Sequence, residues 1–244
     1  DALMLRQDEL QLGRGETVAD TARVLSRYVN GIMIRTFRQS DVEALAEHGD
    51  VPVINGLTDR EHPCQVLTDL YTIRQRFSDW TEVKTAFVGD GNNVANSWLL
   101  AAGKLGLSFA LATPEAYPPD AGILKRAREL AAASGGEIAV GHDPKEAVRG
   151  ARVVYTDTWV SMGAEQERKE RLPKFEGFQV NAGLLSAADP RAIVMHCLPA
   201  HRGEEITDEV MDGPQSVVFD QAENRLHVQK GLLATLLADG SRER

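Results

Sequence analysis

The sequence predicts an α/β fold with two domains, each a mostly parallel sheet flanked by helices, and with the first domain incomplete in this chain. Short apolar runs alternate along the chain with stretches of helical pattern. The apolar runs are nearly continuous, as in strands that are buried on both faces. Strands that alternate with helices in this way are typical of parallel sheets.

Eight apolar runs are candidate strands: 31–37, 51–56, 85–90, 108–114, 137–143, 152–157, 192–199 and 216–221. Five stretches follow helical patterns: 18–29, 62–77, 96–106, 121–134 and 224–239. Gly106, Gly135 and Gly150 fall where the C-terminal caps of helices are expected. The order of these elements favours a sheet that is covered by helices on both faces.

A domain boundary is predicted near residues 78–84. It separates a first domain, 1–77, from a second, 78–223, and we expect the C-terminal helix in 224–244 to pack back on the first domain. The first domain holds two candidate strands and the second holds six. Because two strands do not make a stable parallel domain alone, we expect an N-terminal segment to be missing from this chain.

The composition narrows the class of protein. Hydrophobic residues at 43% and charged residues at 26% are ordinary for a soluble globular protein. The net charge of −9 argues against a nucleic-acid binder, which normally has a basic face. The sequence contains neither a long apolar membrane span nor a signal-peptide pattern. Cys64 and Cys197 are far apart, so we expect reduced thiols in a cytosolic protein.

Polar residues follow several candidate strands, where ligands collect in doubly wound sheets. They are Arg35, Asn55, the turn 89–93, Asp157, His196 with Cys197, and Asp220. The turn 89–93 carries the G-x-G of a dinucleotide fingerprint, but Val94 stands at the third glycine position, so the match is weak. Asn92 and Asn93 favour a polar ligand, and a tight turn without a ligand is the alternative.

The run "HPCQ", residues 62–65, begins a predicted helix with Pro63 at its first position. His62 and Gln65 then lie at a helix N-terminus, where an anion is favoured. Arg35 offers a guanidinium group to a phosphate or a carbonyl oxygen. A surface ion pair is the alternative role for Arg35.

The run "DTWVSMG", residues 157–163, follows another candidate strand. Asp157 can pair with a cationic amine, and a plain helix N-cap is the alternative. Ser161 and Met162 lie on the following turn and could close over a ligand. Arg225 opens the C-terminal helix, where an ion pair with an acidic residue close in sequence is the alternative to a functional role.

His196, Cys197 and His201 lie within six residues of one another. Their spacing fits no common zinc motif, even when His62 and Cys64 are added, so we expect no metal. A nucleophilic thiol at Cys197 would need an activating base and electropositive surroundings, and it stays open as an alternative.

These motifs resemble those of the ornithine carbamoyltransferases, within the aspartate/ornithine carbamoyltransferase family. "HPCQ", "GDGNN", "DTWVSMG", "HCLPAHRGEE" and "FDQAENRLH" occur in that family's order, and residues 11–37 also look like its matching stretch. The resemblance covers nearly the whole chain. D-x-x-x-S-M-G together with H-C-L-P is its specific part, since an aspartate enzyme is expected to have H-P-L-P. Enzymes for aspartate or putrescine are both expected to lack Ser-Met-Gly.

The resemblance implies transfer of a carbamoyl group from carbamoyl phosphate to the side-chain amine of L-ornithine. The products are L-citrulline and phosphate, and the amine attacks directly through a tetrahedral intermediate. It further implies a homotrimer or a multiple of one, a cytoplasmic place in arginine metabolism, and no metal or organic cofactor. Residues 1–77 would be a partial carbamoyl-phosphate-binding domain, and 78–223 the ornithine-binding domain.

The resemblance also assigns roles to residues. Carbamoyl phosphate is assigned to Gln11, Arg35, His62, Gln65, Cys197, Leu198 and Arg225, with Gln11 reaching it from a neighbouring subunit. The catalytic residues among these are Arg35, His62, Cys197 and Arg225. The amino-acid end of ornithine is assigned to Asn93, Asp157, Ser161 and Met162. Cys197 and the Leu198 carbonyl would lie beside the attacking amine, and Arg225 beside the carbonyl oxygen.

The chain departs from the family pattern at one point, because the S-T-R-T-R motif for carbamoyl phosphate does not occur in it. We therefore expect the chain as given to bind carbamoyl phosphate poorly unless another segment supplies that contact. Two alternatives follow: a carbamoyltransferase for another amine, or a non-catalytic α/β module that binds an amino acid.

Overall fold

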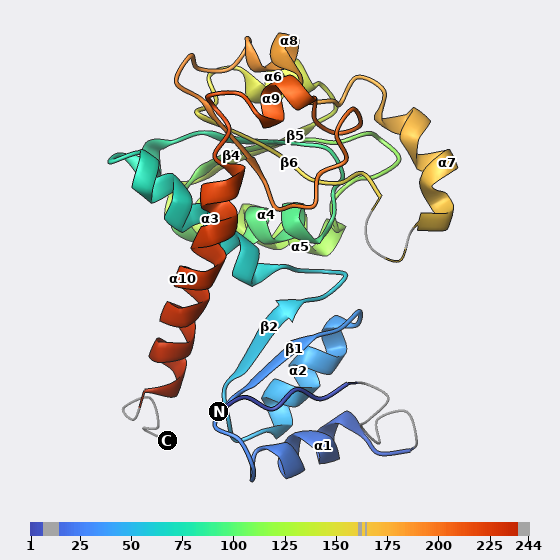
Figure 1. Ribbon diagram of the computed structural model, residues 1–244, viewed down its shortest axis with the longest axis vertical. Coiled ribbons are helices and arrows are strands. Elements are labelled where there is room, and N and C mark those ends of the chain that lie inside the picture. Colours follow the sequence, from blue (N-terminus) through green and yellow to red (C-terminus); the bar gives the residue numbers. More distant parts are fainter. Residues whose placement is uncertain (7–14, 161–162, 164, 239–244) are drawn as a thin grey trace. The chain divides into compact units, whose positions relative to one another are not determined.

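The computed structural model describes residues 1–6, 15–160, 163 and 165–238, which form two compact units (Figure 1). Unit 1 comprises Asp1–Arg60 with Gln229–Arg244, and unit 2 comprises Glu61–Val228. The division falls after Arg60, whereas the sequence predicts a boundary near residues 78–84. The boundary between the two functional domains stays a prediction.

Unit 1 contains a βαβ arrangement. Its elements are α1 (Val18–Leu25), β1 (Ile32–Arg35), α2 (Gln39–His48), β2 (Val53–Leu57) and the end of α10 (Val218–Leu237). β1 and β2 pair in parallel, and they are the two strands that the sequence predicts for this region. Ala22, Val42, Leu45 and Ile54 are buried between these helices and strands.

Unit 2 is built on a five-stranded parallel sheet in the order β5-β4-β3-β6-β7. The strands are β3 (Thr85–Val88), β4 (Ser108–Ala112), β5 (Glu137–Gly141), β6 (Val153–Thr156) and β7 (Ile193–His196). The chain runs outward from β3 to β5 and then returns to β6 on the other side of β3. Ligands of open α/β sheets bind outside the carboxyl ends of the strands at such a reversal.

Helices cover both faces of this sheet (Figure 1). One face packs on α3 (Pro63–Arg76), α4 (Asn93–Leu105) and α5 (Ala121–Ser134). The other packs on α6 (Pro144–Val148), α8 (Ala182–Leu185) and α9 (Asp208–Met211). The remaining elements are the short helix α7 (Arg168–Arg171) and the 3-10 helices η2 (Trp80–Glu82), η3 (Glu165–Glu167) and η4 (Leu172–Phe175). Burial on both faces confirms the predicted parallel α/β architecture.

The strand predicted at 216–221 is wrong, because α10 begins at Val218. Ser216 forms only an isolated parallel bridge with Val194. Val218, Gln221 and Asn224 are buried, and this three-residue spacing follows one face of a helix. The run "SVVF" is apolar like a buried strand. Its two valines are buried, but they lie at the N-terminal end of a helix. Asp220 therefore lies in the first turn of α10 and not at a strand end.

None of the helices within the described residues combines the length and the apolar character needed to cross a membrane.

Candidate active site

The loop after β3 forms a tight turn at the reversal of strand order. Gly89 has a φ of 144°, a conformation that side-chain-bearing residues rarely adopt. A Cβ atom at Gly91 would lie 2.3 Å from the backbone nitrogen of Pro119. Asn92 then caps α4, its side-chain oxygen accepting from the backbone N–H groups of Val94 and Ala95. Both glycines therefore have a structural reason that requires no nucleotide.

Asp157 follows β6 and joins three segments at the same edge of the sheet. Its Oδ2 accepts a hydrogen bond from Asn92 Nδ2 at 2.7 Å. Its Oδ1 accepts from Cys197 Sγ at 2.8 Å and from the backbone N–H of Thr158 at 2.8 Å. Residues 158–160 are not helical, so the N-cap alternative for Asp157 is wrong. Asp157 is instead a nearly buried carboxylate, 4% exposed, that can receive a cationic amine.

Cys197 holds a protonated thiol in this setting. Burial raises the pKa of Cys197 well above its usual value, and the negative charge of Asp157 adds to the effect, whereas Arg225 opposes it. The reactive form of a cysteine is the thiolate, which an electropositive setting favours. The site therefore does not prepare Cys197 as a nucleophile, and the thiol acts as a hydrogen-bond donor.

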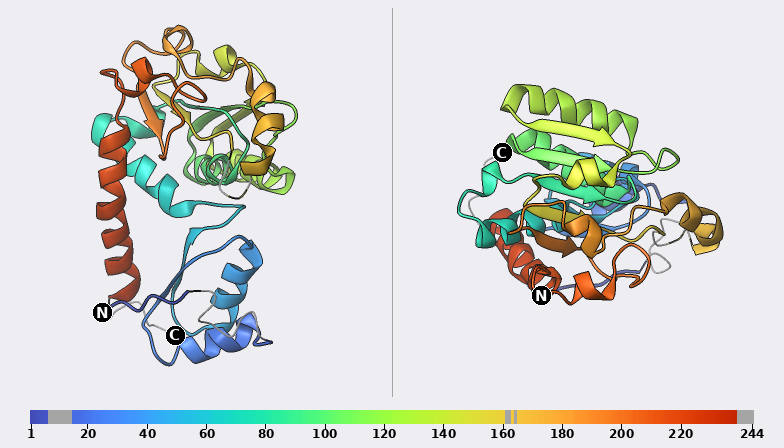
Figure 2. Two further views of the ribbon diagram at one scale, coloured as in Figure 1. Left: turned by 45° about the vertical axis from the view of Figure 1, so that its right-hand side comes forward. Right: turned by 90° about the horizontal axis from the view of Figure 1, so that it is seen from above.

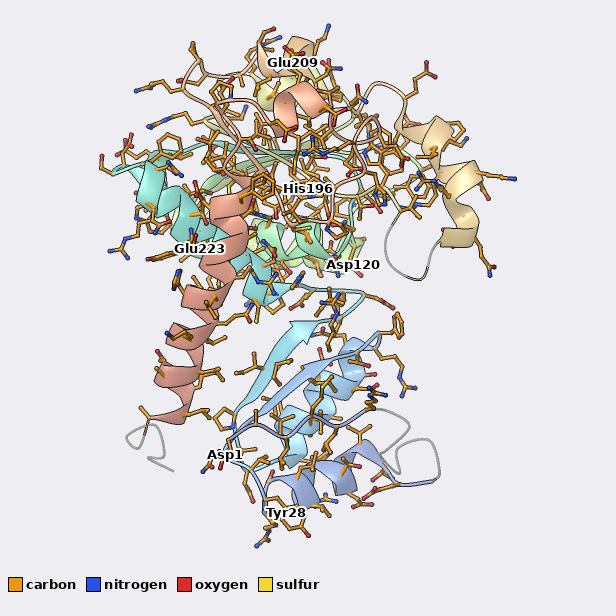
Figure 3. All side chains as sticks on the ribbon, viewed as in Figure 1. Asp1, Tyr28, Asp120, His196, Glu209 and Glu223 are labelled. Carbon is orange, nitrogen blue, oxygen red and sulfur yellow. The ribbon has the colours of Figure 1, made fainter. Side chains whose placement is uncertain are left out.

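His196, at the end of β7, fixes the backbone beside Cys197. Its Nδ1 accepts from the backbone N–H of Leu198 at 2.9 Å, so the ring proton is on Nε2. Nε2 then donates to Glu205 Oε1 at 3.1 Å, and both side chains are fully buried. Figure 3 shows His196 within the body of unit 2, while Glu209 lies at its edge. Leu198 has a φ of 57°, the left-handed region, which sets the direction of its carbonyl group.

Gln65 and Arg225 meet at the N-terminal end of α3. Arg225 NH1 donates to Gln65 Oε1, and Gln65 is only 1% exposed. The nearby acidic residues of α10 have other partners, because Asp220 pairs with Arg76 and Glu223 with His227. The guanidinium group of Arg225 is turned towards α3, while its alternative role in an ion pair with Glu223 or Asp220 stays a prediction.

His62 precedes the first turn of the same helix. Pro63 occupies the first helical position, as the sequence predicts. His62 is 6% exposed, and its backbone N–H donates to Ser97 Oγ on α4 at 2.7 Å. With Arg225 near this helix N-terminus, the local positive potential favours an anion or a polarised carbonyl oxygen.

The structure brings together only part of the predicted site. His62, Gln65, Asn93, Asp157, Cys197, Leu198 and Arg225 all lie in unit 2. Asn93 is the first residue of α4, next to the Asn92 that bonds Asp157. Arg35 ends β1 in unit 1, where it is exposed. Gln11, Ser161 and Met162 fall outside the described residues.

Three residues near Gln65 are not predicted as site residues: Asp69, Gln221 and Tyr155. Asp69 bonds Gln65 and Gln221, and Gln221 also bonds Tyr155. One signal was present, because Gln65 and Asp69 are four residues apart on a predicted helix and therefore share a face. Gln221 comes from a segment more than 150 residues away, and no local pattern reveals such a contact.

Two groups of side chains within the described residues bring possible metal ligands within 4.8 Å of one another. The first is Asp157, His196 and Cys197, whose donor atoms already bond to one another or to Glu205 and Leu198. The second is His201, Glu204 and Glu205, in which Glu204 pairs with Arg168. In both groups, hydrogen bonds or an ion pair within the protein therefore already engage ligand atoms.

Comparison with known proteins decides the family. Residues 1–75 match the family model described as aspartate/ornithine carbamoyltransferase, carbamoyl-P binding domain. Residues 81–236 match the model described as aspartate/ornithine carbamoyltransferase, Asp/Orn binding domain. This chain belongs to the aspartate/ornithine carbamoyltransferase family.

Relatives in this family are similar over nearly the whole chain. An ornithine carbamoyltransferase from Methanoculleus marisnigri is 57% identical over 98% of this chain and 76% of its own length. One from Gloeobacter violaceus is 57% identical over 96% of this chain and 74% of its own. The solved ornithine carbamoyltransferase from Pyrococcus furiosus superposes with a TM-score of 0.91 and 55% identity, covering 97% of this chain and 76% of that one.

Proposed function

We propose that this member of the family transfers the carbamoyl group of carbamoyl phosphate to the side-chain amine of L-ornithine, giving L-citrulline and phosphate. The relatives named as ornithine carbamoyltransferases support this activity. The observation that carries it is the pairing of Cys197 with Asp157 in unit 2, near the cation of Arg225. An acceptor for an amine thus lies close to donors for a carbonyl oxygen and a phosphate.

On the ornithine side, two groups supply hydrogen-bond acceptors: Asp157 for the amino-acid end and the Leu198 carbonyl for the side-chain amine. A carboxylate and a carbonyl oxygen can accept hydrogen bonds from ornithine, and Asn93 adds an amide at the start of α4. The Cys197 thiol orients the amine and forms no covalent bond to the carbamoyl group, because it is protonated. The neutral amine therefore attacks the carbamoyl carbon directly.

At the carbamoyl end, His62 and Arg225 face the charge that develops on the carbonyl oxygen in the tetrahedral state, and Gln65 contacts carbamoyl phosphate through the amide that bonds Arg225. A donor held in place at such an oxygen typically contributes about 3 kcal/mol. After the C–N bond has formed, the C–O bond to the phosphate breaks, and the phosphate leaves with its electron pair and takes up the proton that the nitrogen loses. The cation of Arg225 favours the negative charge that remains on the phosphate. The contacts implied for Gln11, Arg35, Ser161 and Met162 stay predictions.

We also infer a homotrimer or a multiple of it, a cytoplasmic location, and a role in arginine biosynthesis. We assign carbamoyl phosphate mainly to residues 1–77 and ornithine mainly to 78–223. The two substrate assignments are supported by the motifs and by the ranges that the two family models match.

The test is an assay of phosphate release by the protein expressed from its complete reading frame, with ornithine, putrescine and aspartate as amines, and with citrulline measured as the second product from ornithine. We expect turnover with ornithine and at least about a hundredfold lower kcat/KM with the other two, since each would leave polar groups of the site unpaired. Turnover with putrescine or aspartate in place of ornithine would reassign the substrate. Ornithine binding in calorimetry without any turnover would indicate a non-catalytic module.

A further inference from the structure

Asp69, on α3, is a fully buried carboxylate at the centre of a polar network in unit 2. Its Oδ1 accepts from Gln65 Nε2 at 2.8 Å and from Gln221 Nε2 at 2.7 Å. Its Oδ2 accepts from Trp98 Nε1 at 3.1 Å, and the Tyr155 hydroxyl also donates to it. The network joins α3, α4, β6 and α10. Figure 2 draws the ribbon of these elements from two further sides. The catalytic steps described above use none of these contacts.

The direction of these hydrogen bonds fixes how the two amides are turned. Every group that bonds the Asp69 carboxyl is a donor, so Gln65 presents its NH₂ group to Asp69 and its oxygen to Arg225. Gln221 likewise gives its NH₂ group to Asp69 and Tyr155, and its oxygen accepts from the backbone N–H of His196 at 3.0 Å. The orientation of Gln65, and through it that of Arg225, therefore depends on Asp69.

We propose that Asp69 is a positioning residue for the carbamoyl-phosphate end of the site, which holds the Gln65 oxygen against the Arg225 guanidinium. The inference rests on the proposed function, because that function gives Gln65 and Arg225 their roles. Asp69 itself touches no substrate and acts through Gln65.

Stability alone does not explain a carboxylate at this position. Within the described residues Asp69 has no salt-bridge partner, and burying a charge without one is costly. Burial raises the pKa of Asp69 to about 7, although the hydrogen bonds from Gln65, Gln221, Tyr155 and Trp98 oppose the rise. Burying the Asp69 carboxyl costs free energy, yet it holds four hydrogen-bond donors in fixed positions. We therefore infer that its role is to orient those donors.

The test is Asp69→Asn in the protein expressed from its complete reading frame. Asparagine has the same shape but places an NH₂ group among donors, so one of them loses its acceptor. Because the Trp98 indole can only donate, we expect the oxygen of the new asparagine to stay with Trp98 and its NH₂ group to face the two glutamines. Gln221 keeps its bonds to His196 and Tyr155, whereas Gln65 loses the acceptor that orients it. We expect the KM for carbamoyl phosphate to rise about tenfold or more, with the KM for ornithine changed less than about twofold.

Thr72→Val is the matched structural control. Thr72 Oγ1 accepts from Asn224 Nδ2 at 2.9 Å, so this variant also removes a buried hydrogen bond between α3 and α10. It leaves Gln65 and Arg225 untouched, and we expect both KM values to stay within about twofold at a similar loss of thermal stability. In a Gln65→Ala background, Asp69→Asn should cause no further rise in the KM for carbamoyl phosphate.

The outcomes separate the two claims. A wild-type protein that makes no citrulline would overturn the proposed function, and this inference with it. An active wild type in which Asp69→Asn leaves the KM for carbamoyl phosphate unchanged, or raises it no more than Thr72→Val does, would overturn the positioning role alone. Should Asp69→Asn fail to fold, Tyr155→Phe removes one donor to Asp69 at constant shape; a smaller rise in the same KM supports the role, and no rise overturns it.

Discussion

The motif around Cys197 allows either a nucleophilic thiol or a thiol that only donates a hydrogen bond. The structure favours the hydrogen-bond donor. The thiol donates to Asp157, and burial raises its pKa well above the usual value. A raised pKa means that the thiolate forms only at higher pH, so iodoacetamide should alkylate Cys197 in the folded protein far more slowly than in the unfolded protein at pH 8. The nucleophile alternative is thereby disfavoured.

The variant Cys197→Ala tests the role of this thiol. We expect kcat to fall about 10-fold to 100-fold, the effect of losing one hydrogen bond to a charged group, with citrulline formation still measurable. The measurement is steady-state turnover at saturating substrates. Turnover indistinguishable from the uncatalysed reaction would restore the covalent alternative. Cys64→Ala, at the second position of α3, is the control, because no role in the site is assigned to Cys64, and its turnover should stay near that of the wild type.

Individual residues differ in how far the sequence predicts them. Gln65, Asp157 and Arg225 stand in recognisable motifs, and the structure places them in one unit. Asp69 lies outside the quoted motifs, and Gln221 lies inside one but carries no predicted role, because the burial of both polar groups arises only when α3 and α10 pack together. A buried hydrogen bond between segments this far apart leaves no periodic signal in the chain.

Among the elements, β7 and the loop after it depend on one buried pair. The His196 ring bonds Leu198 N–H on one side and Glu205 on the other. Glu205 Oε1 also accepts from the backbone N–H of His201, so this carboxylate ties both ends of the loop. Its loss would leave a buried imidazole N–H and a backbone N–H unsatisfied.

The variant Glu205→Ala is therefore expected to lower the free energy of unfolding by about 2–4 kcal/mol. Its neighbour supplies the control, because Glu204 forms a partly exposed pair with Arg168 and Glu204→Ala should cost less than about 1 kcal/mol. Urea denaturation followed by circular dichroism measures both. Equal losses for the two variants would show that the buried pair does not hold the loop.

Most strands are predictable, and one failure is instructive. Strands β3 to β7 lie inside the predicted runs, because each is a short apolar segment; all of them except the edge strand β5 are largely buried. The run 216–221 fails because an apolar helix N-terminus and a buried strand have the same local composition. The end of a strand is also hard to place, since Cys197 lies beyond β7 although the apolar run continues past it.

At the scale of the molecule, the reversal of strand order between β3 and β6 explains where the chemistry gathers. It brings the ends of those two strands side by side, and with them Asn92 and Asp157. The alternation of strands and helices predicts a sheet of this kind, but not which strands become neighbours. The order of strands follows from the packing of the whole unit.

We propose that ornithine and carbamoyl phosphate are held by different groups of one site, with Asp157 on the ornithine side. The most direct measurement is the steady-state kinetics of Asp157→Ala with each substrate varied in turn. We predict that the KM for ornithine rises about tenfold or more, as expected for losing a charged hydrogen-bond acceptor, while the KM for carbamoyl phosphate stays within about twofold. Equal increases in the two KM values would show that Asp157 does not bind ornithine specifically.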